Sequence, residues 1–150
     1  MDLCLTVNGH QVRERVEPHE LLLDFLRERL RLTGAKRSCD VQVCGACTVL
    51  VDGRPVSACN YLAVEAEGRA VLTVEGFAQT PEFERFEGAF VRHAALQCGY
   101  CTPGLLLTLK SLRDAGELRS EDDIRHGLDG NLCRCTGYRS ILQAAREVAG

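Results

Sequence analysis

The sequence has no tryptophan and few aromatic residues of any kind. Aromatic residues make up only 5% of its 150 residues, although aromatic side chains are the usual stacking platforms for nucleic-acid bases. The formal net charge is −3, and no basic patch suggests a phosphate-binding surface. We therefore expect no nucleic-acid partner.

Long apolar segments and export signals are also missing. No stretch approaches the ~18 consecutive apolar residues that a membrane-spanning helix requires. The N-terminal segment MDLCLTVNGH has no basic region followed by an apolar one and no twin arginine. We therefore expect a cytoplasmic protein with no direct membrane insertion.

The sequence also lacks the residue patterns of a catalytic site. The sequence contains no Ser/His/Asp set, no phosphate-binding glycine loop and no carboxylate pair with an evident catalytic purpose. Its four histidines are scattered and are expected to be surface or packing residues. We thus expect no catalytic residue on this chain, and any substrate site must lie on a partner.

Cysteine, by contrast, is abundant. A secreted protein would use so many thiols for disulfide bonds, but in a reducing cytoplasm metal binding is the better explanation. The nine cysteines stand at positions 4, 39, 44, 47, 59, 98, 101, 133 and 135.

The first half of the chain has the periodicity of strands. Apolar residues alternate with polar ones on both sides of Asn-Gly and Asp-Gly, the favoured turns of two-residue hairpins. A small α+β domain is therefore predicted for residues 1–76. Its predicted elements are a hairpin over 3–16 turning at Asn8-Gly9, a helix over about 20–30, a loop over 34–47, a hairpin over 47–58 turning at Asp52-Gly53, and a short strand with Val71, Leu72 and Val74.

The second half has helical periodicity. Apolar residues recur at helical spacing behind recognisable start signals, which predicts four helices in a helical domain over residues 77–150. The predicted starts are Thr80-Pro81 before Phe83, Thr102-Pro103 before Leu105, Ser120 with Asp123 for a helix to about Leu128, and a last helix over about 138–149.

Four cysteines of the first half follow a recognised ligand spacing. Cys39, Cys44, Cys47 and Cys59 read C-x4-C-x2-C-x11-C, and C-x4-C-x2-C with one distant cysteine is the plant-type [2Fe–2S] spacing. One loop then places three sulfurs around the cluster, and the fourth arrives from the end of the second hairpin. Gly45, between the second and third cysteines, allows backbone N–H groups to approach the cluster sulfurs.

The cysteines of the second half form two close pairs. Cys98, Cys101, Cys133 and Cys135 read C-x2-C-x31-C-x-C, and each pair directly precedes a predicted helix. Two positive helix ends therefore face one site, which favours an anionic group. Taken alone, this pattern suits a tetrahedral zinc ion as well as an iron–sulfur cluster. The ninth cysteine, Cys4, lies in a strand pattern and is predicted to be a small buried hydrophobic residue.

Three segments together carry a family resemblance. GAKRSCDVQVCGACTVLVDGRPVSAC, QCGYCTPG and DGNLCRCTGYRSI resemble the iron–sulfur subunit of the molybdenum hydroxylase (xanthine oxidase) family, and the resemblance covers essentially the whole chain. It implies a β-grasp, ferredoxin-like N-terminal domain and a C-terminal four-helix bundle, each with one [2Fe–2S] cluster. It therefore favours iron over zinc for the second cysteine set.

The resemblance also implies partners and a function. In this family the iron–sulfur chain is an electron-transfer subunit of a molybdopterin-dependent oxidoreductase. It works beside a large molybdopterin-binding subunit and usually an FAD-binding subunit, and we expect a dimer of heterotrimers. Electrons from molybdenum are expected to reach the cluster of the helical domain, then the plant-type cluster, and then FAD or another acceptor.

Individual residues take roles from the same resemblance. The eight cysteines of the two sets match the cluster ligands, while Gln97 and Cys135 match positions at the pterin of the partner subunit. Tyr138 lies in the matching CTGYR stretch, where a structural role is expected. Two positions depart from many relatives, which have glycine at Ser38 and glycine or serine at Gln42, so the fine tuning of the plant-type cluster is open. The remaining alternative function is a zinc-stabilised interaction module with no redox role.

Overall fold

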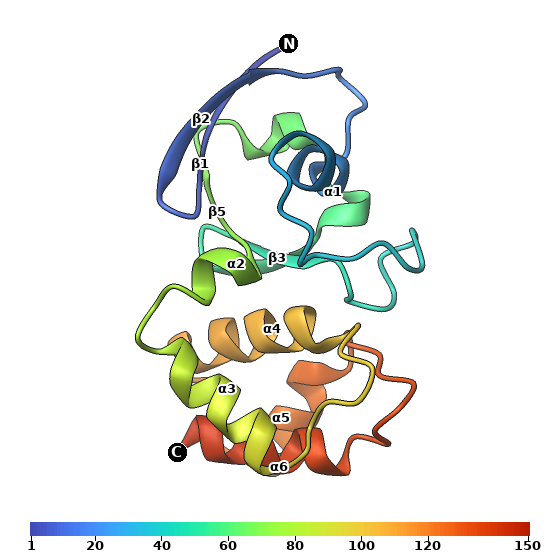
Figure 1. The fold of residues 1–150 in the computed structure, drawn as a ribbon, viewed down its shortest axis with the longest axis vertical. Coiled ribbons are helices and arrows are strands. Elements are labelled where there is room, and N and C mark those ends of the chain that lie inside the picture. The colour runs from blue at the N-terminus through green and yellow to red at the C-terminus, as the bar shows by residue number, and fades with distance from the viewer.

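The computed structural model describes all residues from Met1 to Gly150. A five-stranded mixed sheet lies above a layer of helices, with further short helices on the other side of the sheet (Figure 1). The predicted α+β class is thus confirmed. No helix has the length and apolar character needed to cross a membrane.

Both predicted hairpins are present in the sheet. Strands β1 (Asp2–Val7) and β2 (His10–Arg15) pair antiparallel around the Asn8-Gly9 turn. Strands β3 (Thr48–Val51) and β4 (Arg54–Ser57) do the same around Asp52-Gly53. Strand β5 (Ala70–Leu72) lies between the hairpins, parallel to β1 and antiparallel to β3, which gives the order β2-β1-β5-β3-β4.

The chain turns earlier than predicted at the end of β5. Val74 was expected to belong to this strand, but it begins helix α2 (Val74–Phe77). The side chain of Asn8 explains the difference, because its Oδ1 accepts the backbone N–H of Thr73 at 2.8 Å and its Nδ2 donates to the Thr73 hydroxyl at 2.9 Å. These bonds take the place of further strand pairing.

The predicted helix over 20–30 is formed, but it is not uniform. It begins as α1 (Leu22–Asp24) and continues as a π-helical turn over Phe25–Arg29. Its apolar side, which includes Leu22, Phe25 and Leu26, is fully buried. Two short 3₁₀ turns, Ala58–Asn60 and Ala63–Ala66, were not predicted and cover the same core.

Four longer helices make up the second half: α3 (Phe83–Arg92), α4 (Thr102–Asp114), α5 (Glu121–Leu128) and α6 (Arg139–Ala149). Ser120 caps α5 as predicted, since its hydroxyl accepts the N–H of Asp123 at 3.1 Å. Helix α3 begins at Phe83 and not at Pro81. The hydroxyl of Thr80 explains this later start, because it donates back to the carbonyl of Phe77 at 2.7 Å and ends the preceding turn.

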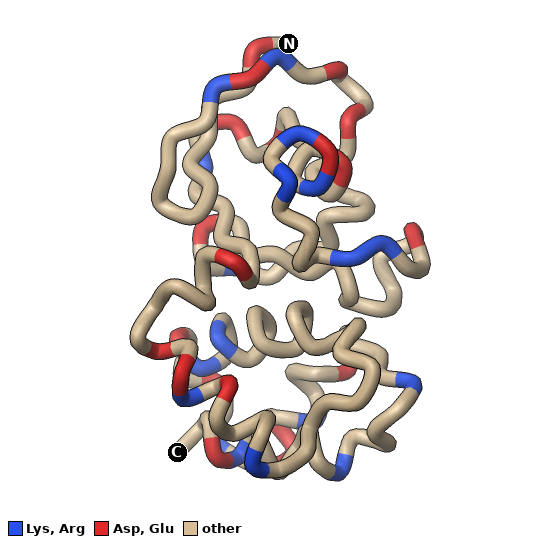
Figure 2. The backbone as a smooth tube through the Cα atoms, in the orientation of Figure 1, with Lys and Arg blue, Asp and Glu red and all other residues tan.

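The apolar interior forms two clusters of buried side chains. One lies between the sheet and α1, and the other lies among α3–α6 and also includes Leu50 of β3 and Phe77 of α2. Helix α4 packs against β3 (Figure 1), and the hydroxyl of its Ser111 donates to the carbonyl of Gly53 at 2.7 Å. The stretch of α4 beside the sheet is largely uncharged (Figure 2). The boundary at residue 76 stays a prediction.

Candidate iron–sulfur sites

The first cysteine set lies on one loop and one neighbouring turn. Cys39, Cys44 and Cys47 follow one another on the loop that leads into β3, and Cys59 lies in the 3₁₀ turn after β4. Cys47 and Cys59 are buried, whereas Cys39 and Cys44 are partly exposed. The loop curves sharply, and Gly45 has a φ of +68°, where a side chain would be strained.

Backbone donors surround the first sulfur of this loop. The N–H groups of Val43 and Cys44 each lie 3.4 Å from the Sγ of Cys39. The N–H of Val41 has the largest effect, and with these two groups it lowers the pKa of the Cys39 thiol to about 6, because all three stabilise the thiolate. Burial has the opposite effect on Cys47 and raises the pKa of its thiol to about 12. Burial therefore disfavours the free thiolate of Cys47.

The second cysteine set joins two loops of the helical half. Cys98 and Cys101 lie between α3 and α4, and Cys133 and Cys135 lie between α5 and α6. The Sγ atoms of Cys98 and Cys135 are 3.5 Å apart, although these residues are 37 positions apart in the sequence. Cys98 and Cys135 are exposed, while Cys101 and Cys133 are partly buried. The predicted convergence of the two pairs is thus formed.

Helix starts and hydrogen bonds shape the second site. Helix α4 begins directly after Cys101, and α6 begins four residues after Cys135, so both loops end at positive helix termini. Burial raises the pKa of the Cys101 thiol to about 12. Burial also acts to raise the pKa of Cys133, but the hydroxyl and N–H of Thr136 donate to its sulfur and the net pKa lies below the usual value.

The donors present fit two-iron clusters. Each set supplies four thiols, which become the thiolate ligands of a [2Fe–2S] cluster. No three Cys, His, Asp or Glu side chains are placed to hold a single metal ion. In addition, the hydroxyl of Thr102, directly after Cys101, is buried and has no hydrogen-bond partner within the chain.

The two cysteine-bearing regions touch through backbone. The carbonyl of Cys44 accepts the N–H of Leu132 at 2.8 Å, and Leu132 directly precedes Cys133. The side-chain amide of Asn131, which is 4% exposed, lies 3.4 Å from the carbonyl of Gly45. This contact between the two sites was not predicted, because its members are far apart in the sequence.

Other residues singled out in the sequence take clear positions. Gln97 is exposed beside the exposed Cys98. Gln42 has a φ of 59°, and its side chain accepts a hydrogen bond from Asn60 at 2.9 Å, which ties the loop to the residue after Cys59. The expectation for Cys4 was wrong. It is half-buried on the outer face of β1, since the alternating inner positions are those of Leu3 and Leu5.

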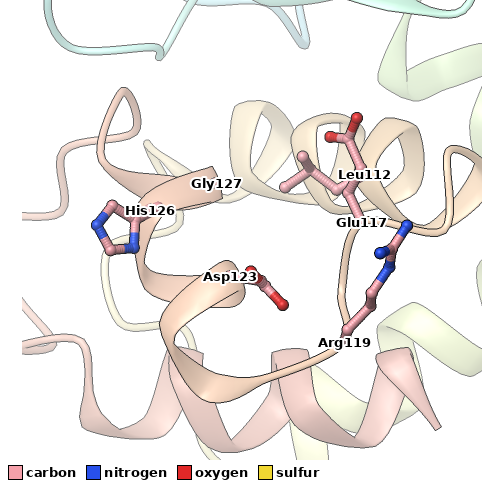
Figure 3. Close-up of a pocket in the computed structure, with 6 residues that line it drawn as sticks. All are labelled: Leu112, Glu117, Arg119, Asp123, His126 and Gly127. Carbon is pink, nitrogen blue, oxygen red and sulfur yellow. The ribbon is translucent and has the colours of Figure 1, made fainter.

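A surface cavity of about 390 Å³ has no cysteine in its lining, and Figure 3 shows the six residues around it. It lies between the end of α4 and helix α5, and the imidazole of His126 lies apart from Asp123 and Arg119. Asp123 is already bonded to the Ser120 hydroxyl, and Arg119 donates to the carbonyl of Gly116. Two of its polar side chains thus have partners within the chain, and no cysteine lines the cavity.

Both halves match known domain families. Residues 5–73 match the 2Fe-2S iron-sulfur cluster binding domain, and residues 73–146 match the [2Fe-2S] binding domain. The protein is therefore an iron–sulfur protein with two [2Fe–2S]-binding domains, and the match of the second half favours iron over zinc there.

Whole-chain similarities define the family more narrowly. The chain is 45% identical to the caffeine dehydrogenase subunit gamma of Pseudomonas sp. (strain CBB1), over 98% of this chain and 90% of that one. It is 41% identical to the xanthine dehydrogenase iron-sulfur-binding subunit of Escherichia coli O157:H7, over 95% and 90% of the two chains. Among solved structures, quinoline 2-oxidoreductase from Pseudomonas putida 86 matches with a TM-score of 0.93 and 45% identity, over 99% of this chain and 93% of that one.

These similarities confirm the family resemblance seen in the sequence. The chain belongs to the iron–sulfur subunits of the xanthine dehydrogenase family of molybdenum hydroxylases. It is thus an iron–sulfur subunit of a multi-subunit molybdenum oxidoreductase, and its role is electron transfer.

Proposed function

We propose that the chain passes electrons from the molybdenum centre of its large partner to FAD, or to another acceptor, on a further subunit. The two [2Fe–2S] clusters supply one-electron redox chemistry when bound. The residues of the chain hold them, separate them from water to different degrees and set their distance from the partners. The β-grasp domain over 1–76 and the four-helix bundle over 77–150 are the proposed carriers.

The proposed ligands are the two four-cysteine sets. Cys39, Cys44, Cys47 and Cys59 would hold the first cluster, and Cys98, Cys101, Cys133 and Cys135 the second. Their spacing, the backbone donors at Cys39 and the convergence of Cys98 with Cys135 support this assignment.

The difference in exposure between the sets carries the proposed direction of electron flow. Cys98 and Cys135 are exposed, whereas Cys47 and Cys59 are buried. Leu96 and Leu132 near the second set are 43% and 49% exposed, and such apolar residues support docking of a protein at this face. The second cluster would therefore receive electrons from the molybdenum subunit.

The first cluster would then release the electrons. Val41 and Val43 on its loop are 66% and 56% exposed, which supports a second protein contact there. The proposed occupant is the FAD-binding subunit. A dimer of heterotrimers completes the proposal and rests on the family resemblance. The proposed location is the cytoplasm, because thiols that bind metal suit a reducing compartment.

The exposed amide of Gln97 offers a test of the electron input. Gln97→Ala leaves all eight cysteines in place but removes a hydrogen bond to the pterin, worth about 1–2 kcal/mol if its partner is left buried. We expect both clusters to assemble normally. In addition, either substrate reduces them more slowly in rapid mixing, or the molybdenum subunit binds more weakly. Reduction by dithionite should not change.

Gln143→Ala is the matched control, because Gln143 is an exposed glutamine on α6. It should leave the rate and the assembly unchanged. If Gln97→Ala also left both unchanged, Gln97 would not lie at the pterin, and the proposed direction of electron flow would rest on the exposure of the cysteines alone.

A further inference from the structure

The sulfur of Cys133 has a hydrogen-bond donor of a kind that the first set lacks. The hydroxyl of Thr136 lies 3.0 Å from the Sγ of Cys133, and the backbone N–H of Thr136 lies 3.5 Å from it. In the first set, the donors to the Sγ of Cys39 at 3.4 Å are backbone N–H groups only. One sulfur of the second site thus accepts a side-chain O–H as well as a backbone N–H.

The direction of this hydroxyl is fixed by its neighbour. Oγ1 of Thr136 accepts the backbone N–H of Tyr138 at 3.2 Å. A threonine hydroxyl has a single proton and two acceptor positions. Because the N–H of Tyr138 occupies an acceptor position, the one proton remains for the sulfur of Cys133.

Tyr138 holds the same loop at its other end. Its hydroxyl accepts the N–H of Cys133 at 2.8 Å and donates to the carbonyl of Asn131 at 3.1 Å. Its backbone has a φ of 67°, an uncommon value for a residue other than glycine. The N–H of Cys133 is therefore directed to Tyr138 and not to a sulfur, and the hydroxyl of Thr136 is the nearest hydroxyl donor to the Sγ of Cys133, at 3.0 Å.

We propose that Thr136 tunes the reduction potential of the second cluster through its O–H···S bond to Cys133. This inference rests on the proposed ligand set. Reduction adds one electron to the cluster and thus one negative charge, part of which lies on the cysteine sulfurs. A donor aimed at such a sulfur stabilises the reduced form more than the oxidised form and raises the potential. Thr136 is a positioning residue, because it acts through Cys133.

The test replaces the hydroxyl while it keeps the shape of the side chain. Thr136→Val should shift the reduction equilibrium of the second cluster about tenfold toward the oxidised form, which corresponds to ~59 mV for a one-electron couple. Thr136→Ser retains the hydroxyl and should restore the potential. Both potentials are measured by titration of the purified complex, followed by electron paramagnetic resonance.

Thr48→Val is the matched control. Thr48 also neighbours a proposed ligand, but its hydroxyl donates to the carbonyl of Gly45 at 2.8 Å and not to a sulfur. The potential of the second cluster should be unchanged in this variant. An unchanged potential in Thr136→Val at full iron content would overturn the proposal, and so would a Thr136→Ser variant that behaves like Thr136→Val.

A measurement on the unmodified complex covers the case in which Thr136→Val fails to assemble. Electron–nuclear double resonance of the reduced second cluster should show a strongly coupled proton that exchanges in D₂O and remains in Thr136→Ser. Absence of that proton would also overturn the proposal. If the potential does not depend on Thr136 but both resonance signals are present, this inference fails and the proposed function stands. If the second signal is absent from unmodified protein, the proposed ligand set is wrong.

Discussion

Two glycines define how closely the cysteine-bearing regions approach each other. A Cβ built on Gly104 at the start of α4 would lie 2.2 Å from the carbonyl oxygen of Gly45, and one on Gly45 would lie 2.3 Å from that of Gly130. Since the opposing atoms are backbone, they cannot rotate away as a flexible side chain would. The residues next to the proposed clusters must therefore be small as well as chemically suitable.

Gly104→Ala should therefore separate the two loops. We expect the variant to unfold at lower temperature, with a loss of about 1–3 kcal/mol from forced overpacking, and to alter the resonance signal of the first cluster, because Gly45 adjoins Cys44. Thermal unfolding and resonance spectra of the loaded protein measure both effects. Gly130→Ala is the control, since no atom lies within 4 Å of its added Cβ. Equal stability of the two variants would contradict a tight backbone contact.

Sequence spacing indicates candidate ligands but not the contacts between the loops that carry them. Cys39, Cys44 and Cys47 are recognisable because one short loop must place all three sulfurs, and this constraint is local. The contact of Asn131 with Gly45 joins residues 86 positions apart, and nothing in the sequence around Asn131 marks it for such a contact. The proposed role of Thr136 depends on the direction of one hydroxyl, which only the folded loop defines.

At the scale of elements, turn and capping residues determine what could be predicted. Asn8-Gly9, Asp52-Gly53 and Ser120 act within a few residues, and the two hairpins and α5 are where these signals place them. The predicted end of β5 and the predicted start of α3 were wrong, because a polar side chain there bonds to a residue outside its own element. Asn8 reaches Thr73 and ends β5 early, while Thr80 bonds backward to Phe77 and delays α3.

An ion-pair network joins the start of α3 to α4. The carboxylate of Glu82 accepts hydrogen bonds from Lys110 at 2.8 Å and from Arg113 at 2.5 Å. Burial by itself would raise the pKa of Glu82, but these two cations outweigh it and hold the pKa below its usual value. The network therefore stabilises the folded state only while Glu82 is ionised.

Glu82→Gln should lower the stability by about 0.5–1 kcal/mol at neutral pH. The pKa of Glu82 is lower in the folded state, so its contribution is fully present above the unfolded value of about 4.3 and is lost as the pH falls through the folded value. The difference in unfolding free energy between wild type and variant should shrink correspondingly in thermal scans at decreasing pH. Glu87→Gln on the exposed side of α3 should show no such difference at any pH, and a constant difference for Glu82→Gln would refute the ionic origin.

At the scale of the whole molecule, the sheet packs directly against the helices of the second half. Leu50 of β3 and Phe77 of α2 are buried with α3–α6, and α4 lies along the sheet (Figure 1). The spacing of apolar residues predicts strands in the first half and helices in the second, but it contains no information on which strand packs against which helix. The backbone hydrogen bond from Leu132 to Cys44 is a consequence of that packing, and it brings the two proposed cluster sites into direct contact.

The central claim is that this chain holds two separate [2Fe–2S] clusters on its two cysteine sets. It is tested most directly by iron, sulfide and resonance measurements on purified protein, with Cys44→Ser and Cys101→Ser beside the wild type. We predict about four iron and four acid-labile sulfide per wild-type chain and two separable signals after reduction. Cys44→Ser should remove or distort one signal only, and Cys101→Ser the other. One zinc or more per chain with little iron, or loss of both signals in either variant while the protein stays folded, would contradict the account.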